Sequence, residues 1–109
     1  MFENEFKSVC QKFGLDPNAV NVSVSIVSPS EIRALKKKYF GLDVPTDVLS
    51  FPNLDLKRGQ IPTRALFPLD FNPETNKIEL GDIVINEQEP DKSALFIHGL
   101  KHLLGEHHE

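Results

Sequence analysis

Apolar and polar residues alternate along this chain with two different periods, which predicts both helices and strands. Residues 2–13 carry apolar side chains at helical spacing before a glycine, so they are expected to form an amphipathic helix. Residues 20–26 alternate valine or isoleucine with asparagine or serine, which is typical of a strand with one buried face. Ser28, followed by Pro29 and Glu31, is the expected N-cap of a second helix that runs to about Phe40.

The second half of the chain predicts two further strands and a last helix. Residues 48–51 form the shorter strand, and residues 78–85 form the longer one, interrupted at Gly81 by a bulge. Asp91 is the expected N-cap of a helix over 92–104, which Gly105 ends. The pattern therefore predicts an α+β fold, in which a small mixed sheet packs with helices in a single domain covering residues 1–109.

A long connection over residues 52–76 separates the two halves. It is longer than a compact domain normally leaves without structure, and it is rich in proline. Its apolar stretch 65–71 is expected to pack as an edge strand or to lie as a flap over the site, because Pro68 bars it from a central strand. Packing is the preferred interpretation.

The last predicted helix carries the residues that indicate a metal site. His98 and His102 are four residues apart, so on a helix they share one face with Cβ atoms about 5–6 Å apart, close enough for both imidazoles to reach one ion. Gly105 accepts the left-handed backbone that follows many helices, which allows the chain to fold back and bring His108 to the same point. Three neutral nitrogens around Zn²⁺ leave a fourth tetrahedral position for water, as in catalytic zinc sites. We therefore expect one Zn²⁺ per chain.

Alternatives remain open at these positions. A histidine pair at this spacing also arises by chance, as buried or surface histidines without a metal. His107 could replace His108 as the third ligand, or contact a ligand from outside the coordination sphere. Gly99 is expected to leave room beside the metal for water or a substrate group, because a glycine inside a helix otherwise costs about 1 kcal/mol relative to alanine.

Three blocks of the sequence, in this order, resemble the YbeY family of bacterial endoribonucleases: residues 38–52 with Pro-Thr-Asp-Val-Leu-Ser-Phe-Pro, residues 80–85 with Gly-Asp-Ile, and the final His-Gly-x-x-His-Leu-Leu-Gly-x-x-His. The resemblance covers the chain from about Ser28 to its end. It implies a zinc-dependent, single-strand-specific endoribonuclease of ribosomal RNA processing and ribosome quality control, with His98, His102 and His108 as metal ligands. It further implies a cytoplasmic protein whose partners are ribosomal RNA and the small ribosomal subunit.

The chain departs from the family pattern at several places. Phe40 stands where family members carry an arginine that is thought to serve activity, and Glu106-His107 replaces the family's Tyr-Asp before the third histidine. A helix usually found before the histidine helix is compressed to residues 86–90, and no counterpart of the family's C-terminal helix is expected. The substrate-binding cations on the second predicted helix are expected to be Arg33, Lys37 and Lys38.

Composition narrows the class of protein. A net charge of −4 argues against generic attraction to RNA, although the local cations and a metal could form one positive groove. No signal peptide and no membrane-spanning apolar run is present, so we expect a protein that does not enter a membrane. The single cysteine, Cys10, lies on the apolar side of the first helix and is expected to be a buried thiol rather than a reactive or ligating one.

The residues leave the reaction route open. Zinc lowers the pKa of its bound water towards about 7, and the RNA 2′-hydroxyl offers a second nucleophile. Gly99 occupies the position at which His-Glu-x-x-His peptidases carry their general base, so a zinc hydrolase of another bond, such as a peptide, is a weaker hypothesis. The third hypothesis, after the endoribonuclease and the hydrolase of another bond, is a metal-binding, ribosome-associated protein with weak or lost activity. The carboxylates that could act as the base, each of which also suits a turn or surface role, are Asp47, Asp82, Glu106 and Glu109.

Overall fold

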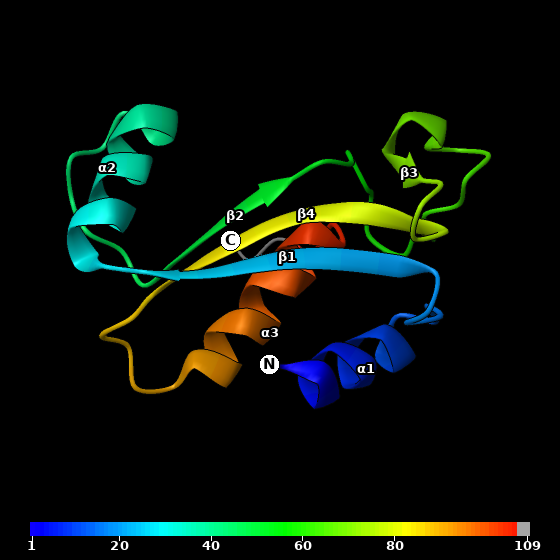
Figure 1. The fold of residues 1–109 in the computed structure, drawn as a ribbon, viewed down its shortest axis with the longest axis horizontal. Coiled ribbons are helices and arrows are strands. Elements are labelled where there is room, and N and C mark those ends of the chain that lie inside the picture. Colours follow the sequence, from blue (N-terminus) through cyan, green and yellow to red (C-terminus); the bar gives the residue numbers. More distant parts are fainter. Residues whose placement is uncertain (107–109) are drawn as a thin grey trace.

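The computed structural model describes residues 1–106 of the 109-residue chain and confirms the α+β class (Figure 1). In chain order the elements are α1 (Glu3–Lys12), β1 (Val20–Val27), α2 (Pro29–Phe40), β2 (Val48–Pro52), the 3₁₀ helix η1 (Pro68–Asp70), β3 (Phe71–Asn72), β4 (Lys77–Asn86) and α3 (Lys92–Leu103). Within the described residues, no helix is both long and apolar enough to cross a membrane.

Two of the helices begin at the predicted caps. The Ser28 hydroxyl accepts a hydrogen bond of 3.2 Å from the backbone N–H of Glu31, and the carboxylate of Asp91 accepts one of 3.0 Å from the N–H of Ala94. These side chains satisfy N–H groups that the first turn of a helix leaves without a partner. The hydroxyl of Ser28 also donates a 3.3 Å bond to the Glu31 carboxylate, which is a contact between side chains and not the bond from the Ser28 backbone N–H that a capping box requires.

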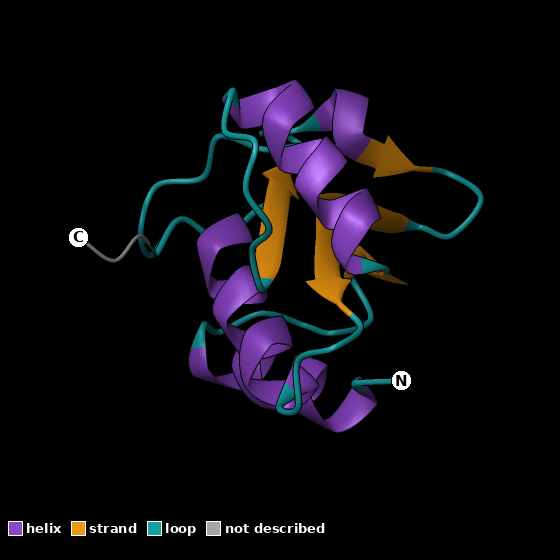
Figure 2. Ribbon diagram, turned by 90° about the vertical axis from the view of Figure 1, so that its left-hand side faces the viewer, coloured by secondary structure: helices purple, strands orange, loops and turns teal. Residues whose placement is uncertain are grey.

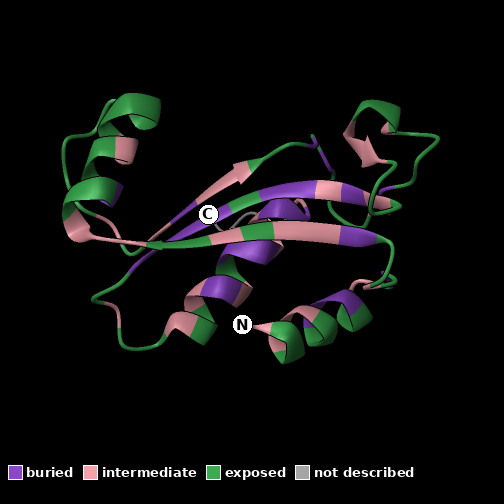
Figure 3. Ribbon diagram, viewed as in Figure 1, coloured by how far each residue is buried: buried purple, intermediate pink, exposed green. Residues whose placement is uncertain are grey.

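Strand β4 is the centre of a mixed four-stranded sheet. It pairs in parallel with β1 along one edge and antiparallel with β2 and β3 along the other. Val24 lies opposite Ile83 across the parallel pair, and Leu49 lies opposite Val84 across the antiparallel pair. Because β4 has neighbours on both edges and helices on both faces, most of its residues are buried, whereas β2 is an edge strand (Figure 3).

The predicted bulge lies in β4. Between the pairs Asn21↔Glu79 and Ser23↔Asp82 the β4 strand contains one residue more than β1. Gly81 has φ +144°, and a Cβ there would lie 2.3 Å from the carbonyl oxygen of Phe51, so only glycine lets β2 approach so closely. The extra residue also changes the side-chain alternation. The β4 side chains that point into the larger of the two hydrophobic cores, the main core, are therefore at even-numbered positions before the bulge and at odd-numbered positions after it. They are Ile78, Leu80, Ile83 and Ile85.

Helices cover both faces of the sheet (Figure 2). The main core lies under α1 and α3, where the rings of Phe2 and Phe96 stack with centroids 4.8 Å apart. A smaller cluster on the opposite face joins Ile32 of α2 to Leu49 and Val84. The sheet therefore holds α2 and α3 on opposite faces, with edge strand β2 between them.

The long connection contributes to packing. Leu54, Leu56 and Pro62 are buried, and Phe67 packs against the main core. The predicted edge strand over 65–71 is wrong in extent, because strand pairing begins only at Phe71 and the residues before it form η1. Phe71 also packs against the main core, whereas Leu66 and Leu69 are exposed, and no residue of 65–71 lines the pocket that contains the histidine pair. The role of this segment as a flap stays a prediction.

Cys10 is fully buried in the main core. Burial raises the pKa of its thiol to about 11, because the thiolate would lose its hydration there. The interpretation of Cys10 as a buried, unreactive thiol is confirmed.

Candidate functional site

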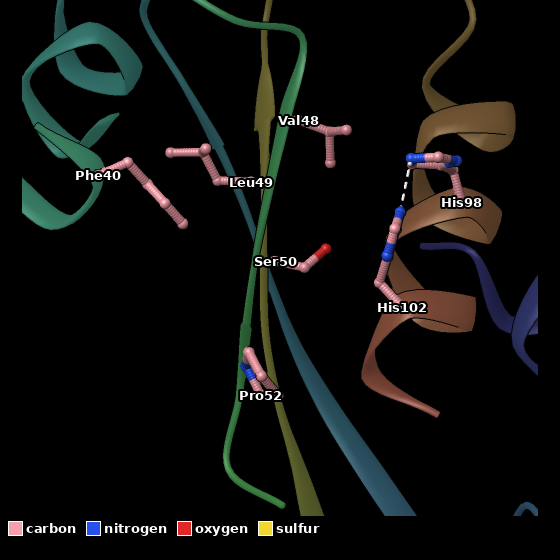
Figure 4. Close-up of a pocket in the computed structure, with 7 residues that line it drawn as sticks. All are labelled: Phe40, Val48, Leu49, Ser50, Pro52, His98 and His102. Carbon is pink, nitrogen blue, oxygen red and sulfur yellow. Dashed lines mark hydrogen bonds between the residues drawn. The ribbon is translucent and has the colours of Figure 1, made fainter. Parts of the chain in front are cut away.

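The two histidines of α3 converge on one point. His98 and His102 lie one helical turn apart, and their Nε2 atoms are 2.9 Å from each other. The ring planes meet edge to face, at 74° with centroids 4.4 Å apart (Figure 4). His98 is exposed and His102 is half-buried, so the pair lies at the surface of the protein.

The geometry of this pair fits a zinc ion. Two nitrogen ligands of a tetrahedral zinc with Zn–N bonds of about 2.0–2.1 Å lie about 3.3 Å apart. The observed separation of 2.9 Å therefore requires the rings to move apart by about 0.4 Å, which side-chain rotation provides. The third predicted ligand, His108, and its alternative, His107, lie outside the described residues. Within residues 1–106, no group of three or more His, Cys, Asp or Glu side chains is placed to hold a metal.

The end of α3 has the geometry that the sequence predicted. Gly105 has φ +90°, its N–H donates to the carbonyl of His102 at 3.1 Å, and the N–H of Glu106 donates to the carbonyl of Lys101 at 3.0 Å. This pair of bonds is the Schellman motif, which stops a helix and turns the backbone away from its axis. A Cβ at Gly105 would lie 2.4 Å from the carbonyl oxygen of Leu56, so the turn also packs tightly against the long connection.

A pocket of about 320 Å³ adjoins the histidine pair. Its walls come from the end of α2, the edge strand β2 and α3. Val48 and Ser50 extend from β2 towards the histidines, while Leu49 and Phe40 lie on the other side of the strand (Figure 4). The lining residues are Phe40, Val48, Leu49, Ser50, Pro52, His98 and His102.

Val48 and Ser50 were not anticipated as site residues. Because side chains alternate along a strand, Val48 and Ser50 lie on the same face of β2, and the sequence alone could have predicted this shared face. Which face looks towards the histidines depends on the antiparallel pairing of β2 with β4 and on the face to which α3 packs. Neither relationship has a local signal in the sequence.

The prediction for Gly99 is wrong. Gly99 is buried and faces the sheet, where a Cβ would lie 3.0 Å from Cγ2 of Ile83 and 3.0 Å from Oγ of Ser50. It therefore does not leave space beside the histidines. Its missing side chain allows α3 to lie close against β2 and β4, which brings the histidines over the edge of the sheet.

Phe40, at the position of the family arginine, lines the same pocket as the two histidines. Its side chain is 52% exposed, and its ring centroid lies 6.0 Å from that of Phe51. An arginine at this position, as the resemblance implies for family members, would therefore line the histidine pocket itself.

The three cations predicted to bind substrate lie on α2 outside this pocket. Nε of Arg33 is 2.8 Å from a carboxylate oxygen of Asp43, and Nζ of Lys37 is 4.0 Å from the other oxygen. Arg33, first by its hydrogen bond and then by its charge, and Lys37 lower the pKa of Asp43. Lys38 instead lies over the ring of Tyr39, with Nζ 5.2 Å from the centroid. Asp43 therefore offsets much of the positive charge of Arg33 and Lys37.

The carboxylates considered as a general base lie elsewhere. Asp47 accepts the N–H of Val48 at 2.7 Å, which makes it a turn residue. Asp82 lies with Tyr39 and Phe51 on the α2 side of the sheet, and Glu106 lies beside Lys101 at the end of α3. Glu109 is outside the described residues. Among residues 1–106, no carboxylate lines the histidine pocket.

Comparison with known proteins gives the same family for the family model and for the individual relatives. The family model described as Endoribonuclease YbeY matches residues 1–109. The Endoribonuclease YbeY of Dehalococcoides mccartyi strain 195 is 36% identical over 108 residues, which cover 86% of this chain and 60% of that protein. The protein of the same name from Clostridium botulinum strain Loch Maree is 28% identical over 127 residues, covering 98% of this chain and 76% of that protein.

A third relative, the Endoribonuclease YbeY of Thermoanaerobacter pseudethanolicus, is 37% identical over 106 residues, covering 83% of this chain and 62% of that protein. The chain therefore spans about three fifths of the length of the Dehalococcoides and Thermoanaerobacter relatives.

Proposed function

This chain belongs to the YbeY endoribonuclease family, and on that premise we propose that it is a metal-dependent endoribonuclease that cleaves single-stranded RNA in ribosomal RNA processing. The observation that best supports the proposal is the convergence of His98 and His102, whose Nε2 atoms lie 2.9 Å apart beside a pocket. The proposed cofactor is one Zn²⁺ per chain, held by these two residues and by His108.

Zinc bound there would supply a Lewis acid for a phosphoryl oxygen and a water of lowered pKa. The protein's own part is positioning. The buried face of α3 fixes the two imidazoles, and Ser50 holds β2 against α3 by donating to the carbonyl of Gly99 at 3.3 Å. Val48 and Pro52 give the pocket apolar walls.

Hydrolysis of a peptide bond is the less favoured chemistry. Zinc peptidases of the His-Glu-x-x-His type carry a glutamate directly after the first histidine, and that position here is Gly99. Since a Cβ at Gly99 would press on Ile83 and Ser50, a glutamate side chain there has no space.

Phe40 supports a second candidate function. Because it replaces the family arginine within the pocket, the site lacks one cation for charge that develops on the phosphate. A protein that keeps the metal site and associates with the small ribosomal subunit in ribosome quality control, with weak or lost turnover, is therefore the alternative. Both proposals place the chain in the cytoplasm with ribosomal RNA.

A cleavage assay separates these functions. The purified protein is incubated with single-stranded ribosomal RNA fragments and, separately, with casein, each with and without a chelator. The endoribonuclease proposal requires chelator-sensitive RNA cleavage that His98→Ala abolishes and that Ser93→Ala, an exposed position of the same helix, leaves intact. Cleavage of casein alone would support the peptidase, and metal binding without cleavage of either substrate would support the ribosome-associated protein.

The ends of the RNA products identify the nucleophile. A 2′,3′-cyclic phosphate beside a new 5′-hydroxyl means that the RNA 2′-hydroxyl attacked the phosphorus and the 5′-oxygen left, whereas a 5′-phosphate beside a new 3′-hydroxyl means that water attacked and the 3′-oxygen left.

A further inference from the structure

Two aromatic rings lie exposed at the end of α2. Tyr39 is 57% exposed and Phe40 is 52% exposed, although each is a large side chain that packing would normally cover. Phe51 of β2 lies between them and the sheet, with ring centroids 5.1 Å from Tyr39 and 6.0 Å from Phe40. Because Phe51 also packs against the smaller core cluster, it supports both rings, while about half of each side chain stays exposed.

The position of Phe40 connects this surface to the histidines. Phe40 is the residue of α2 that lines the histidine pocket, on the opposite side of β2 from His98 and His102 (Figure 4). A ligand group bound at the histidine pair therefore has an open aromatic face within the same 320 Å³ pocket. Serine, valine and proline between them offer no charge to repel a phosphate.

Positive charge flanks the aromatic rings. The last turn of α2 contains Lys37 and Lys38. Asp43 lies close to Lys37, but within residues 1–106 no carboxylate forms an ion pair with Lys38, whose Nζ lies over Tyr39. Lys38 is therefore a cation beside the exposed ring of Tyr39 that forms no ion pair within residues 1–106. This combination suits a single-stranded nucleic acid, whose bases stack on aromatic rings while cations contact the backbone.

We propose that Phe40 is a positioning residue on which a nucleobase of single-stranded RNA stacks, adjacent to the phosphate at the histidine pair, with Lys38 contacting the neighbouring backbone. The inference rests on the proposed endoribonuclease function for the identity of the ligand. The replacement of the arginine would then exchange a charge contact for a stacking contact. It also accounts for a preference for single strands, because a base in a duplex has no free face to offer.

The first test compares variants of Phe40 in binding a short single-stranded 2′-O-methyl RNA, which lacks the internal nucleophile. Phe40→Ala should weaken binding about 10- to 100-fold, as expected for loss of one base–aromatic stack. Phe40→Leu, which keeps apolar bulk but has no ring, should lose nearly as much, whereas Phe40→Tyr should bind like the wild type. Wild-type affinity in Phe40→Leu would overturn the proposal. Thermal unfolding of each variant confirms that it folds.

The second test reports stacking directly. The chain contains no tryptophan, so Phe40→Trp introduces a single tryptophan at the proposed contact, which can be excited selectively beside Tyr39. The single-stranded RNA should quench its emission, while an abasic strand of equal length and charge should not. Leu69→Trp, at a position 97% exposed on η1 at the other end of the sheet, is the matched control and should respond to neither strand. Equal quenching by the abasic strand would overturn the proposal.

The same variants separate this inference from the function on which it rests. Chelator-sensitive cleavage without base-dependent quenching would leave the endoribonuclease intact and remove the role of Phe40. Base-dependent quenching without any cleavage would keep Phe40 as an RNA contact and remove the enzyme. Self-association of the wild type that Phe40→Ala abolishes, together with absent quenching, would show that the aromatic surface pairs two copies of the chain, and would overturn the proposal.

Discussion

The hydroxyl of Ser50 donates a hydrogen bond of 3.3 Å to the carbonyl oxygen of Gly99, which ties the edge strand β2 to the turn of α3 that lies between the two histidines. Gly99 permits this contact because it has no side chain to hold the helix away from the strand. The contact between Ser50 and Gly99 therefore helps to fix the β2 wall of the pocket relative to the proposed metal ligands on α3.

Gly99→Ala should destabilise the fold although alanine is the better helix former. The added Cβ would lie 3.0 Å from both Ile83 and Ser50, and over-packing of this kind typically costs about 1–3 kcal/mol, which exceeds the gain in helix propensity of about 1 kcal/mol. Urea denaturation measures the change. Ala34→Gly, at an exposed position of α2, calibrates the propensity effect alone. A more stable Gly99→Ala variant would show that α3 can shift without cost.

His98→Ala and His102→Ala should each remove zinc from the purified protein. Loss of one of the three proposed ligands leaves a poorly closed site with two protein ligands, which hold the ion weakly. Elemental analysis of the wild type should give about one zinc per chain. Ser93→Ala, on the same helix, serves as the control and should keep its zinc. Stoichiometric metal in both histidine variants would disprove the assignment.

His108→Ala should weaken zinc binding far more than His107→Ala. The Schellman turn at Gly105 directs the backbone away from the axis of α3, and only His108 has the family spacing. Competition with a chromogenic chelator measures both affinities. Equal losses would mean that either histidine can serve as the third ligand.

Phe40→Arg should fold normally and cleave RNA faster than the wild type. Since the side chain at this position is 52% exposed, the guanidinium can stay in water, and the change in stability should remain within about 0.5 kcal/mol. Restoring one charge-stabilising donor should raise turnover by up to about 10²–10³-fold, and a guanidinium plane also stacks on bases. Phe40→Lys, which has charge without the planar fork, should recover less. Unchanged turnover in a stable Phe40→Arg variant would show that the arginine position does not limit the rate.

Cys10 should make stability fall at alkaline pH. The pKa of its thiol is about 11 in the folded protein, against 9.0 in an exposed cysteine. Well below pH 9 the thiol is therefore protonated in both the folded and the unfolded chain, and it adds no pH dependence to the free energy of unfolding. Between these values the unfolded chain loses the proton more readily, so the fold is destabilised progressively, by about 3 kcal/mol in total once the pH exceeds the folded pKa. Unfolding of the wild type and of Cys10→Ala across this range isolates the contribution. Parallel pH profiles would contradict it.

Much of this protein could be read from local patterns in its sequence. The three helices, the strands over residues 20–27 and 77–86, and the caps at Ser28, Asp91 and Gly105 follow from residue spacing and from the backbone preferences of single residues. The pairing of His98 with His102 also follows from spacing, because one helical turn brings them together whatever surrounds the helix.

Other features depended on contacts between segments far apart in the chain. Local spacing could suggest room at Gly99, but only the packing of α3 on β2 and β4 decided that this glycine faces Ile83 and Ser50 instead of the site. The sheet order likewise decided that β2 is an edge strand. Ser50, on one face of β2, and Phe40, on the side of the other face, can therefore line the same pocket as the histidines. Secondary structure is set within a few residues, whereas a pocket wall is set by which elements pack together, and that is a property of the whole fold.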